Sequence, residues 1–437
     1  MSAEHPGRIE GPGETTPPEA EKWNFRVLLG QGVCFETAEV LASPRLVIPF
    51  LYFAVGAPIF FAGLLVPLVQ FARLVTEIVA APVLTAARTR KWFIMLAALA
   101  TATALTIVAL AMRADSTFFV VAIFLLVALV LGTFRGVNTL AYNDLIGRSL
   151  RHQGRNRLMF TQTMIAGVVT ILLTWAAHHF TAASTPLDRH LDLLWGGIAV
   201  TVLAALFAMT VREPLADGDG GYQEGTQRNP QANGQGYLAT LRDGLSEVAR
   251  VPWFRSYVVA RCLLVSVELA MPFYAIHAAA LHSHKQVSLS IFVVATGIAV
   301  VIGGPFWQAL GRISERYVMA LGAGITACAG VWALIIEATP ALQHPVPHGL
   351  VVALVALGTQ GVIGARVLHL VNATSEDKRP YYVAISNTSA GVVGILFAFV
   401  FSSLAHLQGA AWPLFAIVGL NVLAAWACIR LTEPART

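Results

Sequence analysis

The sequence predicts an all-α membrane protein with twelve transmembrane helices, arranged as two pseudo-symmetric six-helix bundles. Charged residues make up only 12% of the 437 residues, roughly half the share found in soluble domains. These charges gather in short patches between long apolar runs. One polar stretch, 217–236, then divides the apolar runs into six and six.

The apolar runs have the length of membrane spans. Trp92–Met112 carries no charged residue, and a helix needs about 20 residues to cross a ~30 Å hydrocarbon layer. Similar uncharged runs predict spans near 117–139, 158–180, 191–211, 289–310, 317–337, 349–371, 383–404 and 410–430. Three further spans, near 25–43, 58–86 and 255–281, keep the length but contain charges.

Lysine and arginine gather in alternate loops. The rich set comprises Arg88, Arg90, Lys91, Arg148, Arg151, Arg155, Arg157, Arg312, Arg316, Lys378 and Arg379. The opposite set holds little beyond Arg45, Arg113, Arg189 and Lys285. Because positively charged loops stay in the cytoplasm, both termini are expected there, in a bacterial inner (plasma) membrane. This asymmetry explains the net charge of +5, so nucleic acid is not an expected partner.

Composition also predicts the domain boundaries. Residues 1–22 are polar and rich in Pro and Gly, which predicts a disordered cytoplasmic tail. The first bundle is expected over 23–211 and the second over 253–431, with a short cytoplasmic tail at 432–437. Between the bundles, 212–252 is a cytoplasmic linker with a surface helix near 237–250.

Sequence motifs for enzymes and cofactors are missing from the chain. There is no GxxxxGK[ST] phosphate loop, no GxSxG elbow and no HExxH metal motif. The four cysteines lie inside predicted spans without a CxxC spacing. No catalytic residue, metal or cofactor is therefore expected.

Nine of the twelve histidines lie towards the outer face: His178, His179, His190, His277, His282, His284, His344, His348 and His406. Such histidines could hold Zn²⁺ or Cu²⁺, or respond to acid outside. Outer loops also tolerate histidine freely, and no set of carboxylate or cysteine partners accompanies these. We therefore predict no metal site.

The two halves carry a weak internal repeat. Glu39 lies thirteen residues beyond Arg26, and Glu268 lies thirteen residues beyond Arg255. A Pro-Phe pair follows each acid, at 49–50 and 272–273. These matches, in the same order, favour two related six-helix halves.

This organisation resembles the major facilitator superfamily over nearly the whole chain, through its six-plus-six spans, central loop and basic loops. Loop 86–91 reads AARTRK, which keeps the basic residues of the family's signature and lacks its acid. The resemblance implies a substrate cavity between the halves that opens alternately to each side. It also implies a secondary active transporter of a small organic solute, acting as a monomer in the lipid bilayer.

In the family, spans one, four, seven and ten line the cavity. Here these spans hold the charges expected to handle substrate or coupling ion: Glu36, Glu39, Arg135, Arg261, Glu268 and Arg366. A charge at the bilayer centre costs ~2.5–3.5 kcal/mol or more, so each needs a partner or water. Arg261 precedes Glu268 by seven residues, a rise of about 10 Å, which we expect to be too long for a direct ion pair. The alternative is a static network of ion pairs.

Two further sets of charges have different expected roles. The resemblance implies that Asp144, at the end of span four, pairs with Arg88 or Arg90 as a cytoplasmic gate when the protein opens outward. Arg73 and Glu77 are i,i+4 neighbours that can neutralise each other as a structural pair.

Three functions stay open on these residues. The first is a secondary active transporter, with coupling to protons undecided. The second is a proton-independent facilitator with structural carboxylates. The third is a sensor or assembly protein that uses a transporter fold without moving a solute.

Overall fold

The structure is a computed structural model that describes residues 18–87, 89–114, 116–150, 152–180, 185–213, 250–285, 287–374 and 379–431. Within these ranges every regular element is a helix. The helices are α1 (Pro18–Leu41), α2 (Val47–Ala54), α3 (Ile59–Ala86), α4 (Lys91–Ala111), α5 (Thr117–Ser149), α6 (His152–Phe180), α7 (Pro186–Met209), α9 (Pro252–His282), α10 (Ser288–Gly311), α11 (Glu315–Ala338), the short 3₁₀ helix η2 (Pro340–Leu342), α12 (Pro345–Asn372), α13 (Arg379–Gln408) and α14 (Trp412–Ile429).

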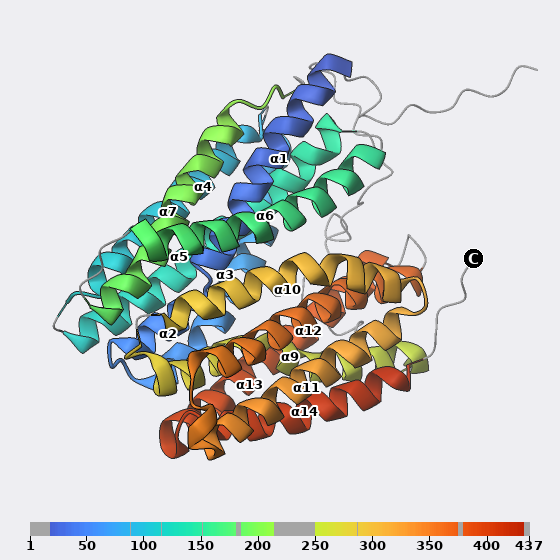
Figure 1. Cartoon of the computed structure of the whole chain (residues 1–437). Helices are drawn as coiled ribbons and strands as arrows, with labels where there is room; N and C mark the ends of the chain where they lie inside the picture. Colours follow the sequence, from blue (N-terminus) through green and yellow to red (C-terminus); the bar gives the residue numbers. More distant parts are fainter. Residues whose placement is uncertain are drawn as a thin grey trace, which may run out of the picture.

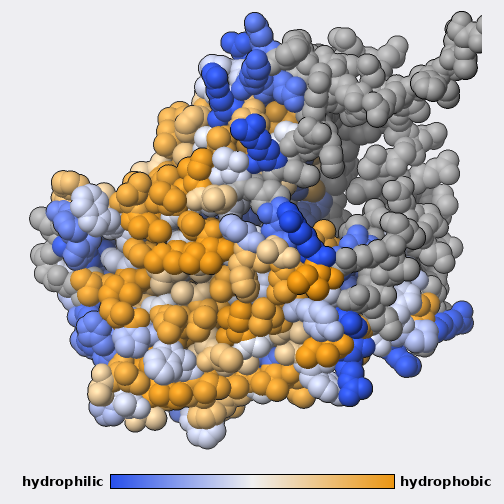
Figure 2. Space-filling model, turned by 45° about the vertical axis from the view of Figure 1, so that its right-hand side comes forward, coloured by the Kyte–Doolittle hydropathy of each residue, from blue (hydrophilic) through white to orange (hydrophobic). Residues whose placement is uncertain are grey.

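The described helices confirm a multi-pass membrane protein. Eleven of them, α3 to α7 and α9 to α14, are long and apolar enough to cross a membrane. Figure 2 shows hydrophobic side chains over a broad band of one face, with hydrophilic side chains towards its rims. The first span is built differently, because α1 ends at Leu41 and the chain continues after a turn as α2.

The start of the first half differs from the prediction, and most of the linker lies outside the described residues. Helix α1 begins at Pro18, inside the predicted disordered tail. Proline is common in the first turn of a helix, and the negative charges of Glu19 and Glu21 stabilise the positive end of the helix dipole. The polar stretch 217–236 and the predicted surface helix up to residue 249 lie outside the described residues.

The helices gather into two bundles (Figure 1), and the helix pairs within each bundle follow the same order. In the first half, α1 packs against α6 and α7, α5 against α3 and α4, and α4 against α7. In the second half the equivalent pairs recur: α9 with α13 and α14, α12 with α10 and α11, and α11 with α14. The prediction of two pseudo-symmetric six-helix bundles is confirmed.

The halves meet along two equivalent helix pairs, α6 with α10 and α3 with α13. At the α6–α10 contact, a Cβ on Gly167 would lie 2.5 Å from Val301 Cγ2 and 3.0 Å from the carbonyl oxygen of Gly297. Glycine therefore allows these two helices to approach closely.

The apolar core differs between the two ends of the molecule. Near α2, a single cluster includes residues of both halves, among them Phe50, Leu194, Phe273 and Phe292. Towards the linker, each half has its own cluster. That of the first half includes Leu28, Ile94 and Val211, and that of the second includes Phe254, Met319 and Val362. A small cluster around Val66 and Leu269 lies between these levels. The halves thus share apolar clusters at the end opposite the linker and between the two levels, while each half has its own cluster towards the linker.

Candidate functional site

The turn between α1 and α2 interrupts the first span inside the protein. Ser43 Oγ accepts hydrogen bonds from the backbone N–H groups of Arg45 and Leu46, each at 3.2 Å. Pro44 follows directly and cannot extend the hydrogen-bond ladder of α1. The turn begins four residues after Glu39. In the second half Pro272 stands four residues after Glu268, inside the continuous helix α9.

In the first half, α1 and α5 bring Glu39 and Arg135 together. Arg135 Nη2 forms an ion pair with Glu39 Oε2. Glu36 lies one turn earlier on α1, where it interacts electrostatically with Glu39 and Tyr142. In the described part of the chain no ion pair includes Glu36.

In the second half, Glu268 is held by two arginines. Its Oε1 lies 2.9 Å from Arg261 Nη1 and 3.2 Å from Arg366 Nε. The expectation that Arg261 is too distant for a direct pair is wrong. The rise of about 10 Å separates Cα atoms, and the long side chains of arginine and glutamate extend towards each other along α9.

Both halves therefore use the same chemistry at corresponding helices. A glutamate on the first helix (α1 or α9) pairs with an arginine on the fourth (α5 or α12). The second group is more deeply buried, with side-chain exposures of 7% for Arg261, 17% for Arg366 and 18% for Glu268. Removing one member of such a buried pair leaves an uncompensated charge. Each pair stabilises its own half and does not bridge the two.

Arg45 is a charged residue that sequence reasoning placed wrongly. We expected it in an outer loop, but it lies in the turn between α1 and α2, next to the buried residues Ala42, Pro44 and Leu46. The carboxylates that attract it are Glu268 of the second half and Glu39 of the first. A Ser-Pro-Arg sequence reads as a loop signal, and only the packing of α2 against α9 shows that this turn is internal.

A hollow lies beside the Glu39–Arg135 pair, within the first half. It lies between α1, α4, α5 and α7 and has a cavity volume of about 20 Å³, room for roughly one water molecule. Its polar lining includes Glu39, Arg135, Asn138 and Thr101. Among the described residues no donor contacts the buried Asn138 Oδ1, so the hollow offers a polar acceptor to water.

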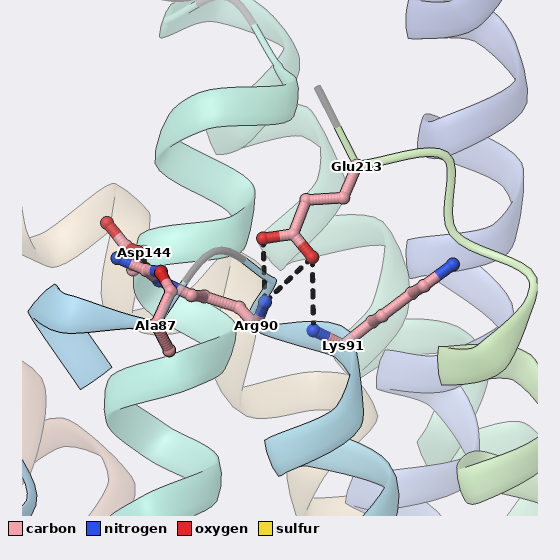
Figure 3. A network of polar contacts seen from close by, with 5 residues as sticks. All are labelled: Ala87, Arg90, Lys91, Asp144 and Glu213. Carbon is pink, nitrogen blue, oxygen red and sulfur yellow. Dashed lines mark hydrogen bonds and ion pairs between the residues drawn. The ribbon is translucent and has the colours of Figure 1, made fainter. Parts of the chain in front are cut away.

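At the linker end, charges gather around the start of α4 (Figure 3). Arg90 Nε lies 2.7 Å from Asp144 Oδ2, and Arg90 Nη1 donates to the carbonyl oxygen of Ala87. Asp144 belongs to α5, so this pair lies within the first half. Arg88, its other predicted partner, lies outside the described residues.

Glu213 completes this cluster, and sequence reasoning missed it. Its carboxylate accepts hydrogen bonds from the backbone N–H groups of Arg90 at 2.7 Å and of Lys91 at 3.2 Å. The positive end of a helix dipole favours such an anion. Loop 86–91 has no acidic residue of its own, and this absence was the one sign in the sequence that an acid from elsewhere in the chain pairs with the loop. The chain supplies the acid from beyond α7.

The predicted structural pair and the histidines occupy other places. Arg73 Nε lies 2.7 Å from Glu77 Oε1 on α3. His277 and His348 are buried side by side, with Nδ1 of His277 3.4 Å from Nε2 of His348, and His277 Nε2 lies 3.0 Å from Glu337. Within the described ranges, no three His, Cys, Asp or Glu side chains form a group that could hold a metal ion.

Comparison with known sequences gives distant relatives. No family model matches the chain. Uncharacterised proteins of Mycobacterium tuberculosis (strain H37Rv) and Mycobacterium bovis are each 25% identical over 411 residues, which cover 93% of this chain and 76% of the relative.

Comparison with solved structures is more informative about the fold. The nucleoside transporter NupG matches with a TM-score of 0.68 and 12% identity, over 94% of this chain and all of that one. The inward-open xylose transporter XylE of E. coli matches with a TM-score of 0.63 and 12% identity, over 94% of this chain and 96% of that one. A human organic anion transporter matches with a TM-score of 0.52 and 14% identity, over 94% and 100%. The chain has the fold of the major facilitator transporters.

Proposed function

We propose that this chain, built on the major facilitator fold, is a secondary transporter. It moves a small organic solute across a bacterial inner membrane by alternating access between α1–α7 and α9–α14. The substrate site lies between the halves, near Glu39, Arg135, Glu268 and Arg366. Transport requires neither a cofactor nor a catalytic residue of this chain.

The observation that carries this proposal is the unequal packing of the two halves. They share one apolar core near α2 but have separate cores towards the linker. Their ion pairs are internal to each half. Two bodies that are each stable and joined mainly at one end can rock against one another, as alternating access requires.

The basic loops orient this arrangement in the membrane. Arg90, Lys91, Arg312 and Arg316 all lie at the linker end, which the positive-inside rule assigns to the cytoplasm. In this orientation, we propose, the structure is that of a state closed on the outside. The Arg90–Asp144 pair is present in this state, so we propose that it stabilises the first half rather than reporting an outward-open conformation.

The ion pairs also bear on the coupling mechanism. Two arginines contact Glu268, which favours a permanently charged, structural carboxylate. Glu36 and Glu39 lie one turn apart on α1, and two neighbouring carboxylates can share a proton. If a proton is coupled to transport, we propose that this pair carries it.

A solute screen followed by a flux assay tests the proposal. The purified protein is screened by thermal shift against a panel of metabolites and drugs, and each stabilising compound is then tested for counterflow in proteoliposomes. We expect a compound that raises the melting temperature to exchange across the bilayer at least about tenfold faster than through protein-free liposomes. A compound that binds tightly without any counterflow would favour the sensor function instead.

A further inference from the structure

Arg45, in the turn between α1 and α2, differs from the arginines of the spans, which contact carboxylates. Glu39 is paired with Arg135, Glu268 with Arg261 and Arg366, and Glu77 with Arg73. In the described part of the chain, no ion pair within 4 Å includes Arg45. Because an arginine side chain stays protonated, a cation remains there without an anion in contact.

The position of Arg45 also differs from that of the paired arginines. The paired arginines each contact a carboxylate of their own half. Arg45 emerges from the α1–α2 turn, whose neighbour α2 packs against α9 of the other half. The carboxylate that attracts it most is Glu268, across the contact between the halves. A ligand bound here would touch both halves, as a transported solute must.

The local backbone adds to the positive character of this turn. Leu46, the residue that precedes α2, provides no side-chain cap, and Ser43 accepts the hydrogen bonds of the Leu46 and Ile48 N–H groups. The positive end of the α2 dipole faces the turn that carries Arg45. Interrupted membrane helices use such ends to hold anionic groups.

We propose that Arg45 binds an anionic group of the transported solute, a carboxylate or a phosphate. The planar fork of the guanidinium donates two parallel hydrogen bonds to either group. Glu268, already held by two arginines, remains close enough to attract a cationic or hydroxyl-bearing part of the same molecule. This inference rests on the proposed transport function and names its substrate class.

The test uses matched pairs of anionic and neutral compounds on the full-length protein. Suitable pairs are benzoate with benzamide and glucose 6-phosphate with glucose, together with acetate and inorganic phosphate as the simplest probes. Thermal shift and equilibrium binding are measured on the wild-type protein and on Arg45→Gln and Arg45→Lys. Arg113→Gln, at an exposed arginine, is the control for a general loss of positive charge.

The expected result is binding of anionic compounds and not of their neutral partners. Arg45→Gln should weaken that binding by about tenfold or more, since a hydrogen bond to a charged group is worth ~1.5–3 kcal/mol. Arg45→Lys should retain part of it, and Arg113→Gln all of it. The benzoate–benzamide pair measures a preference for carboxylate, and the glucose 6-phosphate–glucose pair measures a preference for phosphate.

Three results would overturn the inference: no anionic compound binding to the wild-type protein, equal binding of the neutral partners, or unchanged anion binding by Arg45→Gln. Each leaves the proposed transport function standing. Anion binding that depends on Arg45 but is never accompanied by counterflow would support the anion site at Arg45 and overturn the proposed transport function.

Discussion

Glu268 and Glu39 occupy corresponding helices, yet their surroundings differ. Glu268 is shared by Arg261 and Arg366 and has a side-chain exposure of 18%, whereas Glu39 contacts Arg135 and is 32% exposed. One carboxylate offsets only one of the two positive charges of Arg261 and Arg366, and its removal would leave both buried arginines without a carboxylate in contact. From this asymmetry we propose a structural role for Glu268 and a greater freedom to exchange partners for Glu39.

Substituting Glu268 by Gln tests that structural role. The change keeps the size of the side chain but leaves two buried guanidinium groups without a carboxylate, at a cost of about 3–5 kcal/mol. Folding yield and melting temperature should therefore fall. A second substitution, Arg261→Gln or Arg366→Gln, should restore part of the loss. Full stability of the single variant, with loss of pH-gradient-driven uptake only, would instead assign proton handling to Glu268.

Removing the Glu213 carboxylate should loosen the start of α4. Its hydrogen bonds to the N–H groups of Arg90 and Lys91 resemble a helix cap, and losing a cap costs about 0.5–2 kcal/mol. In Glu213→Ala, amide hydrogen exchange over 90–95 should accelerate, with Glu213→Gln intermediate. The start of α5, capped by Ser116 Oγ, is the internal control. Unchanged exchange over 90–95 would show that Glu213 does not hold this helix.

At the scale of the elements, sequence predicted where the helices lie better than where they break. Apolar length alone located eleven spans. It could not show that Ser43-Pro44-Arg45 interrupts the first span, because the same residues are typical of an outer loop. Spacing likewise misjudged Arg261, since a rise along the helix axis ignores the reach of two long side chains. Glu213 lies far from loop 86–91 in the sequence and becomes its partner only through tertiary packing.

Close packing of α3 against α5 depends on Gly132. A Cβ there would lie 2.3 Å from the carbonyl oxygen of Val69 and 2.7 Å from Ala72 Cβ. Gly132→Ala should therefore lower the free energy of unfolding by about 1–3 kcal/mol. Gly364→Ala on α12 is the matched control, because nothing lies within 4 Å of its Cβ position. The control should be neutral or gain up to ~1 kcal/mol in helix propensity. Equal melting temperatures for the two variants would refute this packing argument.

In the whole molecule, the two halves are built from equivalent helix pairs and contact each other through the equivalent pairs α6–α10 and α3–α13. A small rotation of one half about these inter-half contacts can separate the halves at one end while it closes them at the other. In the proposed transport cycle, the shared core near α2 and the separate cores at the linker end would belong to one of the two positions. Alternating access requires that the other position be populated as well.

Distance measurements between spin labels on the two halves test this requirement most directly. One pair joins Asn143 to Ile313 at the linker end, and the other joins Phe118 to Leu407 at the opposite end; all four side chains are exposed. In lipid nanodiscs, each pair should show two populations of distances. Conditions that lengthen one pair should shorten the other. A single, unchanging distance for both pairs at every pH and with every solute tested would contradict alternating access and with it the proposed transport.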